Sequence, residues 1–310
     1  MSETRISAII PCYNAACFVT ETIKALQNQT HLPDEILVID DGSSDDSAAI
    51  VEALARQDAR IRLLRQKNAG GAQARLAGAR ATSGNLLYFV DADDAPARDA
   101  LERLEAALRL HPQAVLSYGR AQMTDKTLQP IGAPSPKGPS GAVLAKQLWR
   151  NRIMMGSALI RREALRDDSM NHALKVGQDL LMWAQLAACG ECIAIGGAPV
   201  IYYRKHEMNS TRHARHSPPL FEEMVQFMFD YPPVKTALSP RQQRQLKRRR
   251  LAAAYSFIAK TALMQRDWSQ ARYCADMAMR TEPTNVKLWL LWLASRQRWL
   301  AKCAGSFVFR

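Results

Sequence analysis

Short apolar runs alternate with amphipathic stretches along the first 120 residues of the chain. The apolar runs occupy residues 6–10, 35–39, 61–64 and 86–90. Between the first two runs, apolar residues return every three or four positions over residues 19–26, which predicts a helix. Unbroken apolar strands are typical of parallel sheets that are covered on both faces. The pattern therefore predicts an α/β fold, with a mostly parallel sheet flanked by helices.

Polar side chains follow each of these predicted strands. They are Tyr13 and Asn14, then Asp40 and Asp41, then Asn68, and finally the acidic segment of residues 91–94. In open α/β sheets, ligands bind outside the carboxyl ends of the strands. We therefore expect the four groups to lie along one rim of the sheet and to form a ligand site.

The remaining sequence continues this fold and then becomes helical. Four prolines and three glycines in residues 130–141 predict a loop. Strand-like segments follow at residues 154–160, 192–195 and 200–203, and a helix is expected over residues 178–188. From Pro240 onward the pattern is helical. We expect a catalytic-type α/β domain over residues 1–216, a linker and helix over 217–245, and a small all-α region over 246–310.

Composition places the chain among globular proteins. It has 310 residues, of which 47% are hydrophobic, and this excludes a disordered or collagen-like chain. No apolar run reaches the roughly 18–20 residues of a membrane-spanning helix, and no apolar signal core follows the N-terminus. Cys189 and Cys192 have the spacing of a redox or zinc pair, but no second pair accompanies them. Scattered cysteines suit a reducing compartment, so we expect a cytoplasmic protein.

The charge is distributed unevenly along the chain. Residues 204–310 hold 20 Lys and Arg against 7 Asp and Glu, whereas residues 1–203 hold 22 of each sign. A basic final third is typical of proteins that meet an anionic partner, such as a lipid surface, and it is also typical of a solvated helix face. No nucleic-acid recognition motif accompanies the charge, so we expect no nucleic-acid partner.

Three aspartates stand at the end of the fourth predicted strand. Asp91, Asp93 and Asp94 would repel one another, and their burial would be costly without compensation. A divalent cation such as Mn²⁺ or Mg²⁺ compensates such a cluster and commonly also binds phosphate oxygens. Acidic capping of the next helix is the alternative interpretation.

The four groups, taken in order, resemble the motifs of the family 2 glycosyltransferases, which have the GT-A fold. The motifs are residues 11–14, 40–43, 68–75 and 91–94, and the resemblance covers residues 5–210. It implies a nucleotide-diphospho-sugar donor and a hydroxyl acceptor on a glycan or lipid-linked precursor, as in bacterial surface polysaccharide or glycolipid synthesis. It also implies peripheral attachment to the inner face of a membrane.

The resemblance implies a role for individual residues. Those expected around the donor are Pro11, Tyr13, Asn14, Asp40, Asp41, Asn68, Gly70, Arg75, Asp91, Ala92, Arg204 and His206. Asp40 is the first choice for binding the nucleobase, which would leave Asp41 to cap the helix that follows. Asp93 is the leading metal ligand, with Asp91 and His206 beside it. Leu76 stands where relatives commonly have Asn.

A second centre is expected at the start of the helix over residues 178–188. By resemblance, Asp179 is the general base that deprotonates the acceptor hydroxyl. Gln178 replaces the glutamate that is usual in the family, so a neutral group stands beside the base. A base opposite the leaving group implies a single in-line displacement with inversion at the anomeric carbon.

The spacing of alanines and aromatic residues over residues 255–283 resembles one tetratricopeptide repeat. Tryptophans and basic residues follow it over residues 288–302. Such a mixture suits either a membrane interface or a helix packed on the repeat. The sequence does not predict an oligomeric state.

Two other functions compete with the transferase. A sugar nucleotidyltransferase would need a glycine-rich, basic loop after the first strand, and residues 11–17 contain no glycine, lysine or arginine. A non-catalytic adaptor with a decayed transferase domain is favoured by Gln178 and opposed by Asp91, Asp93 and Asp179.

Overall fold

The computed structural model describes residues 4–166, 174, 177–207, 209 and 217–296. The chain divides into two compact units. The first unit comprises Met1–Gln147, Asn151–Ala173 and Gln178–Glu207, and the second comprises Leu148–Arg150, Leu174–Gly177 and Met208–Arg310. Of the helices that the structure describes, none combines the length and the hydropathy that crossing a lipid bilayer requires.

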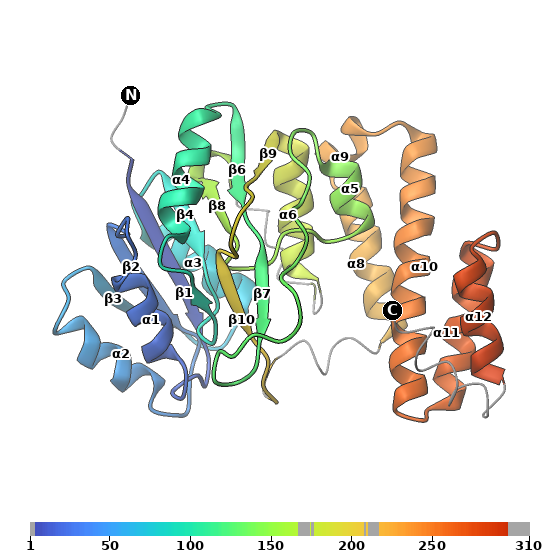
Figure 1. The fold of residues 1–310 in the computed structure, drawn as a ribbon, viewed down its shortest axis with the longest axis horizontal. Helices are drawn as coiled ribbons and strands as arrows, with labels where there is room; N and C mark the ends of the chain where they lie inside the picture. The colour runs from blue at the N-terminus through green and yellow to red at the C-terminus, as the bar shows by residue number, and fades with distance from the viewer. Residues whose placement is uncertain (1–3, 167–173, 175–176, 208, 210–216, 297–310) are drawn as a thin grey trace. The chain divides into compact units, whose positions relative to one another are not determined.

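The first unit is built on a seven-stranded sheet with the order β3-β2-β1-β4-β8-β6-β9 (Figure 1). Its strands are β1 (Ile6–Cys12), β2 (Glu35–Asp40), β3 (Ile61–Arg65), β4 (Leu86–Phe89), β6 (Ala114–Tyr118), β8 (Ala158–Arg161) and β9 (Glu191–Ala194). β8 runs antiparallel to β4 and β6, and the other pairings are parallel. The mostly parallel α/β sheet expected from the apolar runs is confirmed.

Helices cover both faces of this sheet. α1 (Val19–Gln27), α2 (Ser47–Ala55) and α4 (Ala100–Leu110) share one core with alternate residues of β1, among them Ile6, Ala8 and Ile10 (Figure 1). α3 (Gly71–Ala81) packs against the opposite face of β1. At Gly78 of α3 an added Cβ would lie 2.4 Å from Cγ2 of Ile9, so only glycine allows this close approach.

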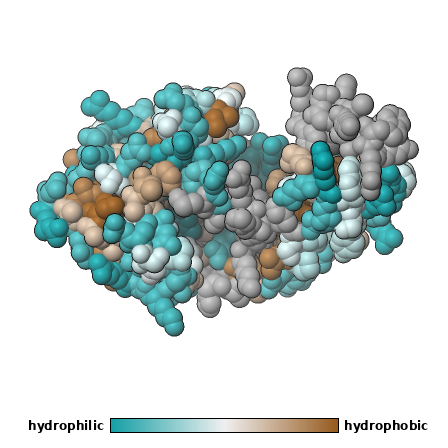
Figure 2. Space-filling view, turned by 90° about the horizontal axis from the view of Figure 1, so that it is seen from below, coloured by the Kyte–Doolittle hydropathy of each residue, from teal (hydrophilic) through white to brown (hydrophobic). Residues whose placement is uncertain are grey.

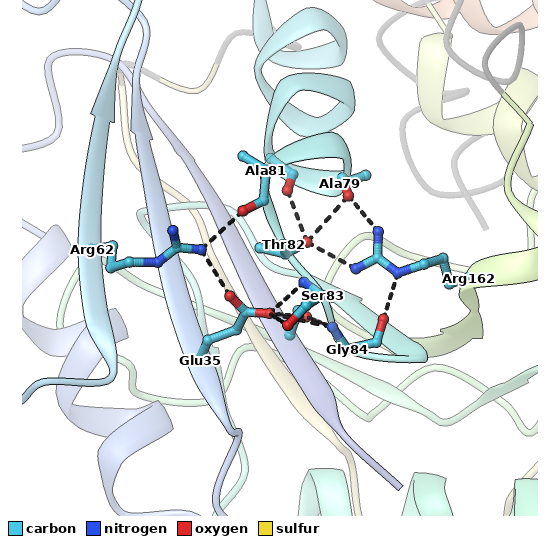
Figure 3. A network of polar contacts seen from close by, with 10 residues as sticks. Glu35, Arg62, Ala79, Ala81, Thr82, Ser83, Gly84 and Arg162 are labelled. Atoms are coloured by element: carbon cyan, nitrogen blue, oxygen red, sulfur yellow. Dashed lines mark hydrogen bonds and ion pairs between the residues drawn. The ribbon is translucent and has the colours of Figure 1, made fainter. Parts of the chain in front are cut away.

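The C-terminal end of α3 is fixed by a polar network at the amino ends of the strands (Figure 3). Arg162, in the short helix η1 (Arg162–Ala164), donates to the carbonyl oxygens of Ala79 and Gly84 and to Oγ1 of Thr82. Arg62 bridges the Glu35 carboxylate and the carbonyl oxygen of Ala81 at 2.8 and 2.9 Å. These contacts satisfy carbonyl groups that a helix end leaves without partners, and they hold α3 in place on the sheet.

A small second sheet has the order β5-β10-β7 and was not expected from the sequence. Its strands are β5 (Ala95–Pro96), β7 (Ala121–Thr124) and β10 (Ile201–Arg204). The strand expected over residues 154–160 is shorter, because Gly156 takes a φ of 75° in a turn and β8 begins at Ala158. The described residues before 207 also form α5 (Leu144–Trp149) and α6 (Gln178–Cys189), and α6 agrees with the helix expected there.

The described residues from 217 to 296, in the second unit, are mostly helical. They form α8 (Pro218–Asp230), α9 (Pro232–Ala237), α10 (Pro240–Met264), α11 (Trp268–Thr281) and α12 (Val286–Arg296). α10 and α11 pack through small buried residues such as Ala259, Ala262, Ala271 and Ala275. The boundary expected at residue 245 is wrong, because it falls inside the continuous helix α10. The likeness to a tetratricopeptide repeat stays a prediction, and residues 297–310 of the expected basic helix lie outside the described residues.

Candidate functional site

The polar residues that follow β1, β2 and β4 lie at one rim of the large sheet. In the parallel register, Cys12 at the end of β1 pairs with Asp40 at the end of β2, and Ile9 pairs with Phe89 at the end of β4. The residues that follow these strands therefore leave the sheet on the same side. This is the arrangement expected for a site at the carboxyl ends of the strands.

Asp40 and Asp41 are both buried, but they have different partners. Asp40 Oδ1 accepts a hydrogen bond from the Ser43 backbone N–H at 3.0 Å. Asp41 accepts from the backbone N–H groups of Ala69 and Gly70, both at 2.8 Å. Asp41 thus anchors the loop that precedes α3. The expectation that it caps α2 is wrong, because its carboxylate is committed to this loop.

The residues after β1 combine a structural tie with an exposed ring. Asn14 takes a φ of 49°, and its Oδ1 accepts from the Ser44 backbone N–H at 2.8 Å. Its own N–H donates to Oγ of Ser43 at 3.0 Å. Tyr13 is 55% exposed and Pro11 is half-buried at the end of β1. Asn14 therefore joins the ends of β1 and β2, while the Tyr13 ring is accessible to a ligand.

An arginine near the start of α3 contacts the acidic residues. Gly70 precedes the helix with a φ of 88°, a conformation that glycine adopts readily, and Asn68 is exposed. Arg75, one turn into α3, forms an ion pair with Asp91, and its side chain is 13% exposed. At Gly71 an added Cβ would lie 3.3 Å from the Arg75 guanidinium, so this glycine leaves room for the arginine.

Asp91, Asp93 and Asp94 belong to one loop, which we call the acidic loop (residues 91–94). Each offers an oxygen, and these oxygens lie within 4.8 Å of one another. Burial and the charge of Asp91 raise the pKa of Asp93, although its hydrogen bond from His206 acts in the opposite direction. Burial, followed by the charges of Asp93 and Asp91, raises the pKa of Asp94 well above its usual value.

Backbone contacts hold the acidic loop from two sides. Oγ1 of Thr22, a fully buried residue of α1, lies 2.8 Å from the carbonyl oxygen of Ala92 and 2.7 Å from that of Asp94. On the other side, the Arg204 backbone N–H donates to Oδ1 of Asp94 at 2.9 Å. The loop is therefore fixed before any ligand arrives. Asp94 does not cap α4, because Asp99 occupies that position.

Arg204 is part of this support. It is buried, and its guanidinium donates to the carbonyl oxygens of Asp93 and Lys126, both at 2.7 Å, and to the Glu21 carboxylate at 2.6 Å. The group also lies 4.9 Å from the centre of the Phe18 ring. This geometry favours a positioning role over the phosphate contact that the sequence suggested for Arg204.

The donor set of the acidic loop fits a hard divalent cation. Asp94 Oδ2 is buried without a hydrogen-bond partner among the residues that the structure describes. His206 Nε2 lies 2.8 Å from Oδ2 of Asp93, so an imidazole stands beside the same oxygens. Carboxylate oxygens are the ligands that Mg²⁺ and Mn²⁺ prefer. Asp91, Asp93 and Asp94 could hold such an ion, with His206 next to it.

Asp179 stands in the first turn of α6. Together with Gln178, Arg75, Ala72, Met155 and Met182 it lines one narrow pocket. Asn151 donates to Oδ2 of Asp179 at 3.2 Å. Arg75 therefore contacts the acidic loop and lines the same pocket as Asp179. Neither Thr22 nor Asn151 was expected from the sequence, since neither belongs to a local motif.

Comparison with known proteins decides the family. The model for glycosyl transferase family 2 matches residues 7–168, just over half of the chain. The chain belongs to glycosyl transferase family 2. The family resemblance noted in the sequence is thereby confirmed.

Relatives of this family 2 glycosyltransferase domain are found in several bacteria. An uncharacterized glycosyltransferase of Rickettsia conorii is 28% identical over 188 residues, which cover 61% of this chain and 31% of the relative. Glycosyltransferase GlyG of Streptococcus pneumoniae is 39% identical over 105 residues, covering 34% of this chain and 35% of the relative. The chain spans about a third of the length of the curated relatives that it matches.

Solved structures share the fold. A crystal structure of S. aureus TarS residues 1–349 in complex with UDP-GlcNAc superposes with a TM-score of 0.69 at 18% identity, covering 94% of this chain and 87% of that one. The GT-A-type architecture expected from the sequence is confirmed by this match.

Proposed function

We propose that this chain is an inverting, metal-dependent glycosyltransferase that moves a sugar from a nucleotide diphosphate to an acceptor hydroxyl. One observation carries the proposal. Arg75 pairs with Asp91 of the acidic loop and lines one pocket with Asp179. Arg75 is suited to bind a charged leaving group, and Asp179 is suited to abstract a proton. The two side chains are neighbours, as a transfer between donor and acceptor requires.

The donor would lie along the rim. In the described part of the chain, Asp40 accepts a single hydrogen bond, from Ser43, so its carboxylate retains acceptor capacity for a nucleobase N–H. The exposed Tyr13 ring offers a surface for the base or ribose. The Arg75 guanidinium is suited to a diphosphate oxygen, because its planar donors match phosphate geometry.

The acidic loop would hold the metal through Asp93 and Asp91, with Asp94 and His206 in support. A bound Mn²⁺ or Mg²⁺ supplies Lewis-acid stabilisation of the diphosphate leaving group. Thr22 holds the main chain of the loop, and the Arg204 backbone N–H holds the Asp94 carboxylate, while the leaving group departs.

Asp179 would accept the proton of the acceptor hydroxyl as that oxygen attacks the anomeric carbon. The new bond forms opposite the departing diphosphate, so the configuration inverts. General-base catalysis of this kind contributes about 10²–10⁴-fold to a rate. The acceptor would be a glycan or a lipid-linked sugar in bacterial surface polysaccharide or glycolipid synthesis, which the bacterial origin of the relatives supports.

The first experiment measures donor binding. We expect UDP, GDP or dTDP to raise the melting temperature when Mn²⁺ or Mg²⁺ is present and to have no effect with a chelator. Because the similar TarS was crystallised with UDP-GlcNAc, UDP-sugars come first in a panel that measures sugar-nucleotide hydrolysis. A chain that responds to no nucleotide diphosphate would instead be the non-catalytic adaptor.

The second experiment concerns the base. Asp179→Asn should retain nucleotide binding and lose transfer by about 10²-fold or more. Asp99→Asn is the matched control, because Asp99 also stands at the start of a helix, α4, and its carboxylate pairs with Arg103. Unchanged turnover in Asp179→Asn would remove Asp179 from the mechanism.

A further inference from the structure

α12 is apolar on two opposite faces. One face packs into the core of the helical unit through Leu288, Leu291 and Ala294, each at most 5% exposed. The opposite face carries Val286, Trp289, Leu290 and Leu293, whose exposed fractions are 71%, 46%, 49% and 41%. We call these four residues the α12 stripe.

The spacing of the α12 stripe is that of a single helix face. Its members stand at positions i, i+3, i+4 and i+7, which align along one side of an α-helix. A helix that is apolar all round is normally buried or in contact with lipid. By contrast, the protein face in Figure 2 is mostly hydrophilic, and its apolar residues form small separate groups. The α12 stripe is therefore a surface that a partner would cover.

The charge around the α12 stripe indicates what that partner is. Residues 218–296 hold 13 Lys and Arg against 6 Asp and Glu. Lys287 is exposed on α12 itself, and Arg296, which is also exposed, pairs with Asp276 at 2.7 Å. Lys287 also lies near Lys260 of α10, whose pKa is lowered by burial and by the charge of Lys287. Such an excess repels a second copy of the same surface and attracts an anionic one.

The indole N–H groups of both α12 tryptophans already have hydrogen-bond acceptors within the protein. The indole N–H of Trp289 donates to the carbonyl oxygen of Pro283 at 2.9 Å, and that of Trp292 donates to Asp276 at 2.7 Å. Each ring can therefore leave water without an unsatisfied donor. Tryptophan prefers the interface between lipid and water, and lysine and arginine beside it reach the headgroups.

We propose that the α12 stripe lies in the surface of an anionic lipid bilayer, with α12 parallel to the membrane plane. The described part of α12 has 11 residues, fewer than the about 20 that crossing the hydrocarbon core takes. A short helix with an apolar stripe and flanking cations is suited to the interfacial position. The contact is independent of sugar transfer, since it uses none of the residues of the acidic loop.

Flotation of the full chain with vesicles tests the proposal. We expect binding to vesicles of phosphatidylcholine with phosphatidylglycerol, weaker binding to phosphatidylcholine alone, and weakening by added salt. The double variant Leu290→Glu/Leu293→Glu should reduce binding roughly tenfold or more, because two leucines no longer enter the lipid. Leu32→Glu/Leu110→Glu is the matched control, with the same charge change at two exposed leucines of the first unit, and it should reduce binding less than about twofold.

Circular dichroism and nucleotide-induced melting shifts show whether each variant is folded. If Leu290→Glu/Leu293→Glu does not fold, Leu290→Ser/Leu293→Ser takes its place. Equal binding by the stripe variant and the control would overturn the proposal. So would a wild-type chain that forms dimers in sedimentation and binds no vesicles, because the α12 stripe would then be covered by a second copy.

Discussion

Asn151 donates a hydrogen bond from Nδ2 to Oδ2 of Asp179 across 3.2 Å. The amide of Asn151 is itself fixed, because its Oδ1 accepts from Nε2 of the buried Gln147 at 2.7 Å and from the Ile153 backbone N–H at 3.1 Å. Its NH₂ group is therefore held toward the carboxylate. A general base works best when its carboxylate is oriented in advance, so Asn151 is a positioning residue for Asp179.

Replacing Asn151 with Ala should lower kcat about tenfold and leave the donor KM within about twofold. The reason is that the variant frees the Asp179 carboxylate to rotate but leaves the donor-binding rim intact. Steady-state kinetics at saturating acceptor measures the two constants separately. Asn28→Ala, at an exposed asparagine after α1, is the control. A higher donor KM with unchanged kcat would assign Asn151 to donor binding instead.

Thr22→Val removes the hydroxyl that lies within hydrogen-bond distance of two carbonyl oxygens of the acidic loop but keeps the shape of the side chain. Because those carbonyls are buried, we expect a loss of about 1–3 kcal/mol in the free energy of unfolding and weaker metal-dependent nucleotide binding. Chemical denaturation and calorimetric titration measure the two effects. Thr20→Val on the same helix is the control, since Thr20 makes no side-chain hydrogen bond with any residue in the described ranges. Equal losses in both variants would show that Thr22 has no special role.

Arg75 is expected to contribute both charge and geometry. Arg75→Met leaves Asp91 without its cation, so donor affinity should fall at least about tenfold. Arg75→Lys keeps the charge but loses the planar fork, and a smaller loss is expected. Titration with a nucleotide diphosphate and Mn²⁺ ranks the three proteins. Equal affinities for wild type and Arg75→Met would exclude Arg75 from the donor site.

Glu35 makes the stability of the network at the end of α3 depend on pH. Burial opposes ionisation of Glu35, but hydrogen bonds from Ser83, Ser7, Gly84 and Arg62 outweigh it and lower the pKa of the carboxyl. A lowered pKa adds stability that is fully present above the unfolded value of about 4.3 and is lost as the pH falls through the folded value.

Glu35→Gln should therefore unfold about 1–2 kcal/mol more easily than wild type at pH 7, and the difference should shrink below about pH 4. Urea denaturation over a range of pH measures it. Glu52→Gln is the control, because Glu52 forms an exposed ion pair with Arg65. A difference that stays constant from neutral to acid pH would show that the Glu35 charge is not involved.

The sequence predicts the part of the fold that its apolar runs encode. β1, β2 and β4 are unbroken and buried, so their positions follow from hydropathy alone. β7 escapes such an analysis because its buried residues include Gln122 and Thr124, whose polar groups bond to backbone carbonyls in the folded chain. A buried strand that contains such polar residues cannot be recognised from the hydropathy of its sequence.

The site divides in a similar way. Asp91, Asp93 and Asp179 stand in recognisable local patterns, so they were expected. Asn151 was not, because its contact with Asp179 joins positions 28 residues apart and leaves no local signal. The support from Arg204 likewise depends on a contact with residues more than 100 positions earlier, which spacing alone does not reveal.

The anchoring of the acidic loop has a consequence for protein engineering. The Thr22 hydroxyl and the Arg204 guanidinium form hydrogen bonds with carbonyl oxygens of the main chain. Substitution of the Asp91 or Asp93 side chain therefore leaves these backbone contacts in place. The metal-binding side chains of the acidic loop can therefore be exchanged one at a time on an unchanged backbone. Luminescent lanthanide ions, which favour the same oxygen donors, would then report by light emission whether a metal ion is bound at the acidic loop.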